Sequence, residues 1–145
     1  MGAGRNLFGK EPGKKEQEAF KELVRNADAG DGDAKEQLRQ MIKSDETRQG
    51  ERLARTRIEI YTQAAYQGDL QAQYWLGISY ARLLDKEASL EWLTGPAKKG
   101  HVKAMKAIAK GYGPKGVYGY RRDEQRFWIL KAAEAGDARS QADMG

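Results

Sequence analysis

Residues 64–80 read Ala-Ala-Tyr-Gln-Gly-Asp-Leu-Gln-Ala-Gln-Tyr-Trp-Leu-Gly-Ile-Ser-Tyr. In this stretch Gly68 stands between two segments whose apolar residues recur at helical spacing. Glycine readily takes the left-handed conformation that ends a helix, and the Asp69 side chain is suited to cap the helix that follows. The stretch therefore predicts two antiparallel helices joined by a tight turn at Gly68.

The same pattern occurs four times along the chain. In each copy an alanine stands three positions before the glycine and a small residue stands four positions after it. The glycines are Gly30, Gly68, Gly100 and Gly136. Because neither helix of such a pair can bury its apolar stripe alone, neighbouring pairs must stack on one another.

The apolar spacing predicts an all-α fold. Gly95-Pro96 falls inside one helix, which is expected to kink or end early because proline lacks the backbone N–H. Helices are predicted near 15–29, 32–43, 50–67, 70–84, 86–98, 102–112, 122–135 and from 137 onward. We expect a flexible tail at 1–13 and one domain at 14–145. The domain contains repeats near 27–64, 65–96 and 97–132 and a partial repeat at 133–145.

Composition narrows the class of protein. The 145 residues include no cysteine, which excludes disulfides, thiol nucleophiles and zinc-ribbon ligands and favours a reducing compartment, so a cytoplasmic location is expected. Hydrophobic residues make up 39% of the chain and charged residues 32%, which is typical of a globular protein and not of a disordered one. The sequence contains no apolar run that predicts a signal peptide or a membrane span.

Together these residues resemble the Sel-one-like repeats, a branch of the tetratricopeptide-like helical repeats. The family pattern is roughly Ala-Ala-x-x-Gly-x-x-x-Ala-x-x-x-Leu-Gly-x-x-Tyr, followed by Gly-Val, Asp and a Trp before the next Ala-Ala, and residues 64–80 match its first part. The second part is matched by Gly116-Val117, Asp123, Trp128 and Ala132-Ala133. The resemblance is strong over 58–145 and weak over 20–57. It implies a right-handed α–α superhelix, or solenoid, of about three to four helix-turn-helix repeats.

The last repeat is incomplete, because Gly145 matches the position of Gly77 inside a first helix. Either the final helix packs as a cap or the natural chain continues.

The sequence contains few candidate catalytic residues. His101 is the only histidine, and it stands in a repeat turn where the other copies have aspartate, so a capping or solvent-facing role is expected. The glycine-rich loop at 111–119 lacks the Gly-Lys-Ser/Thr ending of a phosphate-binding loop. We therefore expect no enzyme, no metal site and no cofactor.

A basic stripe is the sharpest surface feature. Lys99, Lys103, Lys106 and Lys110 follow one another at helical spacing. In tetratricopeptide-like arrays the first helix of each pair lines the concave face, and the equivalent positions of the preceding repeat are Gln71, Tyr74 and Ile78. These residues predict a concave face that binds an acidic or mixed segment of another protein. A solvated helix face that only keeps the protein soluble is the competing interpretation.

Nucleic-acid binding is the alternative function. Lys115, Arg121, Arg122 and Arg126 form a second basic patch, and aromatic residues lie between them as in some single-strand binders. Acidic neighbours such as Asp123 interrupt this patch, so a protein partner is preferred. Small bacterial proteins similar to this one act as adaptors, regulators, or inhibitors and immunity proteins for an effector. The oligomeric state stays open.

Overall fold

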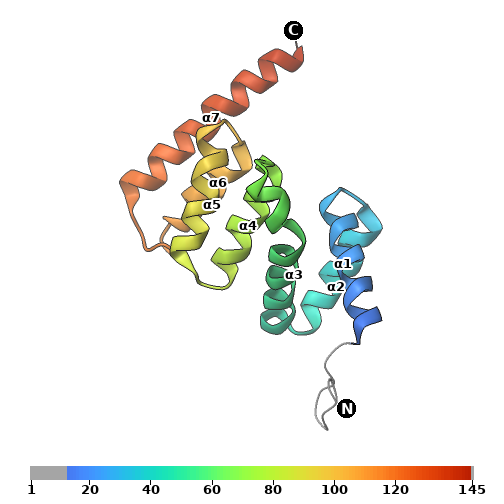
Figure 1. Ribbon diagram of the computed structural model, residues 1–145. Coiled ribbons are helices and arrows are strands. Elements are labelled where there is room, and N and C mark those ends of the chain that lie inside the picture. The colour runs from blue at the N-terminus through green and yellow to red at the C-terminus, as the bar shows by residue number, and fades with distance from the viewer. Residues whose placement is uncertain (1–12, 145) are drawn as a thin grey trace. The chain divides into compact units, whose positions relative to one another are not determined.

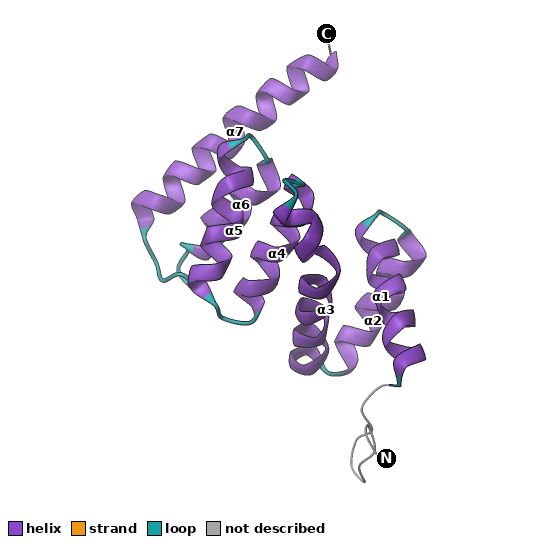
Figure 2. Cartoon of the chain, in the orientation of Figure 1, coloured by secondary structure: helices purple, strands orange, loops and turns teal. Residues whose placement is uncertain are grey.

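The computed structural model describes residues 13–144. In this range the chain forms seven helices and no strand, which confirms the all-α prediction (Figures 1 and 2). Contacts divide the chain into two compact units, Met1–Thr56 and Arg57–Gly145, called here the N-terminal unit and the C-terminal unit. The predicted tail at 1–13 lies outside the described residues, apart from Gly13.

In the N-terminal unit, α1 (Lys14–Asp28) packs against α2 (Gly32–Ser44). Phe20 and Val24 of α1 are buried, as is Leu38 of α2. The first part of α3 (Glu46–Tyr66) also belongs to this unit, and its Arg52 guanidinium lies 3.9 Å from the centroid of the Phe20 ring. Partial burial lowers the pKa of Arg52.

The C-terminal unit stacks successive helices, as expected of a helical repeat. The helices are α4 (Leu70–Arg82), α5 (Lys86–Lys98), α6 (Val102–Gly111) and α7 (Arg122–Met144). Each packs against the next, and α4 also contacts α6. One buried cluster centres on Ala65, Ala72 and Leu76. A second one, which includes Leu93 and Ile108, joins α5, α6 and α7.

The predicted glycine turns are present at three of the four repeats. Gly30, Gly68 and Gly100 have φ angles of 110°, 99° and 92°. After each glycine the next residue caps the following helix; the Asp69 carboxylate, for example, accepts a hydrogen bond from the Ala72 N–H at 3.0 Å. Positive φ is the conformation in which glycine has no steric cost, so these turns confirm the prediction.

The fourth turn was predicted wrongly, because α7 continues through Gly136 to Met144 as one helix. A glycine inside a helix costs only about 1 kcal/mol relative to alanine, and the residues on both sides are good helix formers. The separate helix predicted from 137 onward is therefore the end of α7.

The start of α3 differs from the sequence prediction. Helix α3 begins at Glu46 rather than 50, because the Asp45 carboxylate accepts a hydrogen bond from the Arg48 N–H at 3.3 Å. Helix α5 has its predicted bounds of 86–98, so the expectation that Gly95-Pro96 would end it early was wrong. Pro96 lies in its last turn, so the missing N–H removes little of the helix.

No helix in residues 13–144 has both the length and the apolar character needed to cross a membrane.

Candidate interaction surface

Helix α6 carries the predicted lysine stripe. Lys103, Lys106 and Lys110 are all exposed, while Ala104 and Ile108 on the opposite side are buried. These three lysines are called the lysine stripe below. Within the described chain none of them forms an ion pair, so their charges face solvent.

Lys99 does not belong to this stripe. It follows the end of α5 and precedes the start of α6, so the helical spacing on which its prediction rested does not apply to it.

Two pockets flank the lysine stripe. The pocket toward α4, called the loop-side pocket, has a volume of about 660 Å³ and is lined by Ile78, Ala107 and Lys110 among others. The pocket toward α7, called the α7-side pocket, has a similar volume of about 660 Å³, and Lys106 and Ile129 line it together with Lys110. No carboxylate is found among the described residues that line either pocket.

The three predicted residues of α4 do not form one open wall. Gln71 is exposed, whereas Tyr74 and Ile78 are half-buried and pack against the second cluster of the core. Ile78 shares the loop-side pocket with Lys110. Gln71 and Tyr74 instead contact His101 at the start of α6.

His101 joins α4 to α6 with three interactions. Its Nδ1 accepts a hydrogen bond from the Ala104 N–H at 3.1 Å, which confirms the predicted capping role. Since Nδ1 accepts, the proton of the neutral ring is on Nε2, which donates to Gln71 Oε1 at 2.8 Å. The ring also stacks on Tyr74, with centroids 5.2 Å apart. These contacts fix the start of α6, the helix that carries the lysine stripe, against α4.

The loop between α6 and α7 forms one wall of the loop-side pocket. The Tyr118 N–H donates to the Gly111 carbonyl at 2.9 Å, and a side chain on Gly111 would overlap the Tyr118 ring. The Tyr118 hydroxyl lies 2.6 Å from the hydroxyl of Ser89, which is fully buried. Burial raises the pKa of Tyr118, and the hydrogen bond to Ser89 opposes this effect only in part.

The alternative basic patch is exposed. Its members, Lys115, Arg121, Arg122 and Arg126, all face solvent. Arg121 lies 3.4 Å from the Asp123 carboxylate.

Two of the tyrosines near this patch are used in packing. The rings of Tyr112 and Tyr118 contact each other at 5.0 Å, and Tyr118 is hydrogen-bonded to Ser89. Tyr120, the third tyrosine near this patch, is 55% exposed and could serve as a stacking platform.

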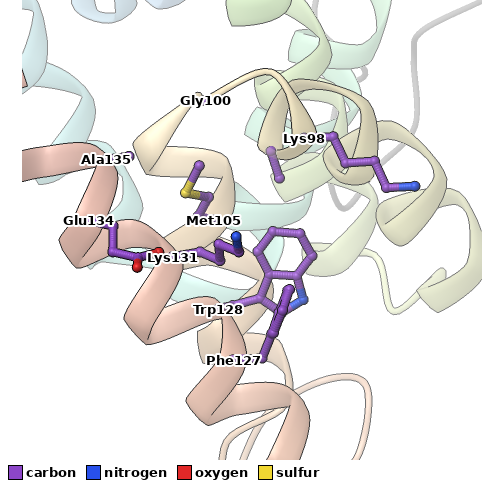
Figure 3. Close-up of a pocket in the computed structure, with 9 residues that line it drawn as sticks. Lys98, Gly100, Met105, Phe127, Trp128, Lys131, Glu134 and Ala135 are labelled. Atoms are coloured by element: carbon purple, nitrogen blue, oxygen red, sulfur yellow. The ribbon is translucent and has the colours of Figure 1, made fainter. Parts of the chain in front are cut away.

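A third pocket, of about 450 Å³, lies between α7 and the end of α5. Figure 3 shows Phe127, Trp128 and Lys131 from α7 beside Met105 from α6. Phe127 is 50% exposed, and its ring meets that of Trp128 edge-on at 5.1 Å. Across the described residues no set of His, Cys, Asp and Glu side chains gathers as a metal site.

Sequence reasoning missed Leu84, which lies in the turn between α4 and α5. Leu84 has φ 64°, and no other described residue except glycine has a positive φ. Its N–H donates to the Ala81 carbonyl at 3.0 Å, as the Gly68 N–H does to the Ala65 carbonyl. Part of the signal was present in the sequence, because Asp85 caps α5 as Asp69 caps α4, and Leu84 stands directly before it as Gly68 stands before Asp69.

No protein-family model, no curated protein and no solved structure matches the chain. The resemblance to Sel-one-like repeats stays a prediction that rests on the residues quoted for it.

Proposed function

We propose that this chain is a non-catalytic interaction module that binds an acidic or mixed segment of another protein along the lysine stripe. The module is a right-handed α–α solenoid of Sel-one-like repeats in this proposal, and the lysine stripe lies on its concave face. An adaptor and an inhibitor or immunity protein for an effector would both use such a surface. A cytoplasmic location agrees with the absence of cysteine.

The observation that supports this proposal is the position of the lysine stripe between two apolar pockets. Lys110 lines both pockets, and Lys106 lines the one toward α7. A peptide lying across α6 would place carboxylates on the lysines and apolar side chains in the pockets. In such an arrangement the lysines raise the association rate by electrostatic steering, and the buried apolar contacts raise the affinity.

A random-peptide display library selected on the immobilised full-length chain tests the proposal. We expect the enriched peptides to carry Asp or Glu, and we expect their affinity to fall by about tenfold or more when Lys103, Lys106 and Lys110 are changed to Glu. The matched control reverses three exposed lysines of the N-terminal unit in the same way. Its substitutions are Lys14→Glu, Lys15→Glu and Lys35→Glu.

Equal weakening in the control would mean that net charge alone drives binding, which would contradict the proposed surface. A mobility-shift assay with single- and double-stranded nucleic acid over a salt series tests the alternative. Sub-micromolar binding that weakens steeply with salt and is lost on Arg122→Glu and Arg126→Glu would favour the nucleic-acid function instead.

A further inference from the structure

Leu84 has a left-handed backbone conformation that favours glycine. The three equivalent turns of the repeats use glycine at Gly30, Gly68 and Gly100, and Leu84 adopts the same hydrogen bonding with φ 64°. Its side chain is 74% exposed, so burial in the core does not compensate for the strained backbone. An exposed leucine alone means little, but strain and exposure at one residue point to a role in binding.

Leu84 stands at the edge of the loop-side pocket. The pocket is lined by apolar side chains, among them Ile78 and Val117, and by two exposed lysines, Lys110 and Lys115. A volume of about 660 Å³ falls in the range that holds a bound ligand or a large anchoring side chain. Since the described lining residues include no carboxylate, the charges of the pocket complement an anionic ligand.

The wall that the loop between α6 and α7 contributes to this pocket is preformed. Gly116 packs so closely on the Gly111 carbonyl that any side chain at Gly116 would overlap it. The Arg121 N–H donates to the Tyr112 carbonyl at 2.9 Å and closes the loop at its base. With the Tyr118–Ser89 hydrogen bond these contacts hold the wall before anything binds, which lowers the entropy cost of binding.

We propose that the loop-side pocket is an anchor site for one large apolar side chain of an acidic peptide, with Leu84 as its contact at the rim. Carboxylates next to the anchor side chain meet Lys110 and Lys115. This inference rests on the proposed function and adds to it the register of the bound segment, because Lys110 belongs to both the lysine stripe and the pocket.

The peptides enriched on the full-length chain provide the probe. We expect them to share one Leu, Ile, Met or Phe with Asp or Glu within two positions, and we expect replacement of that residue by Ala to abolish binding. Leu84→Gly should weaken binding by about tenfold or more, measured by fluorescence polarisation. Leu84→Met should retain binding, since it keeps an apolar side chain at the rim.

Lys115→Glu should weaken binding as well, whereas Lys35→Glu, the same charge change on α2, should not. If Leu84→Gly and Lys115→Glu bind normally while Lys103→Glu and Lys106→Glu do not, the anchor site is wrong and the proposed function stands. Failure to enrich any acidic peptide contradicts both. A dimer of the wild-type chain in sedimentation that dissociates on Leu84→Gly would identify a second copy as the occupant and overturn the peptide proposal.

Discussion

His101 shows how one side chain can align two helices. Its ring caps α6 through Nδ1 and reaches Gln71 of α4 through Nε2. We expect His101→Ala to lower the free energy of unfolding by about 1–2 kcal/mol, because the cap and the contact with α4 are both lost. His101→Asp restores the cap and should recover part of this loss in urea titrations followed by circular dichroism. Equal destabilisation by both substitutions would show that capping contributes nothing.

Leu84 predicts a conflict between stability and binding. Replacing it with glycine relieves the left-handed strain of about 1–2 kcal/mol but makes the unfolded chain more flexible, so a net stabilisation of about 1 kcal/mol is expected. Thermal and urea unfolding of Leu84→Gly measure it, with Leu83→Gly as the control that should destabilise, since Leu83 has φ −86°. A destabilised Leu84→Gly variant would mean that the Leu84 side chain packs more than its exposure indicates.

Ionisation of the Tyr118 phenol should make the free energy of unfolding depend on pH in the alkaline range. Burial raises the pKa of its phenol in the folded state, while the unfolded chain keeps the ordinary value of 10.0. The stability that the neutral, buried phenol contributes is therefore complete below about pH 10. It is lost as the pH rises through the folded-state pKa. Urea unfolding between pH 8 and about 11 should show a steeper loss of stability for the wild type than for Tyr118→Phe. Parallel curves would contradict the effect of burial.

The same substitution tests the Ser89 contact at neutral pH. Tyr118→Phe leaves the buried Ser89 hydroxyl without this partner, which should lower the free energy of unfolding by about 1–3 kcal/mol. Ser89→Ala in the Tyr118→Phe background should recover part of that loss.

At the scale of residues, the exposure of a side chain could be predicted from the sequence, whereas the strained backbone of Leu84 could not. Exposure of the lysine stripe follows from helical spacing alone. The four-fold pattern is defined by its glycines, so it does not include a leucine that adopts the same conformation, and Asp85 alone predicts the helix start but not the strained residue before it. The stacking of His101 on Tyr74 joins residues of two helices, so no local pattern predicts it.

At the scale of elements, the two kinds of glycine in this chain should respond oppositely to alanine. Gly136 lies inside α7, and an added Cβ meets nothing within 4 Å, so Gly136→Ala should stabilise the protein by about 0.5–1 kcal/mol. Gly100 has φ 92°, so Gly100→Ala should destabilise it by about 1 kcal/mol or more. Urea unfolding followed by circular dichroism measures both. Destabilisation by Gly136→Ala would mean that Gly136 is a turn in solution.

Helix positions could be predicted well because each helix carries its own signals. The caps at Asp31, Asp69 and His101 mark three helix starts to the residue. The continuation of α7 could not be predicted in this way, since Gly136-Asp137 has the same local sequence as a true turn. Whether such a glycine ends a helix depends on packing with a following segment, which is a tertiary effect.

At the scale of the whole molecule, charge is concentrated toward the C-terminal end. Residues 97–145 contain 11 basic and five acidic side chains, whereas 59–96 contain two and five. We expect the association rate of an enriched acidic peptide to fall by about tenfold or more as salt rises from low ionic strength to about 0.5 M, with a smaller change in the dissociation rate. Stopped-flow mixing separates the two rates. A salt effect confined to dissociation would contradict long-range steering.

The three tryptophans of the chain, Trp75, Trp92 and Trp128, all belong to the C-terminal unit, and Trp128 lines the pocket of Figure 3. The described lining of the loop-side pocket includes Tyr118 but no indole. Intrinsic emission therefore distinguishes the two pockets without a label on the protein. A peptide that carries a fluorescence quencher on its anchor side chain would strongly reduce the emission of Trp128 only when it occupies the pocket of Figure 3. Binding that leaves the Trp128 emission unchanged would therefore indicate the loop-side pocket.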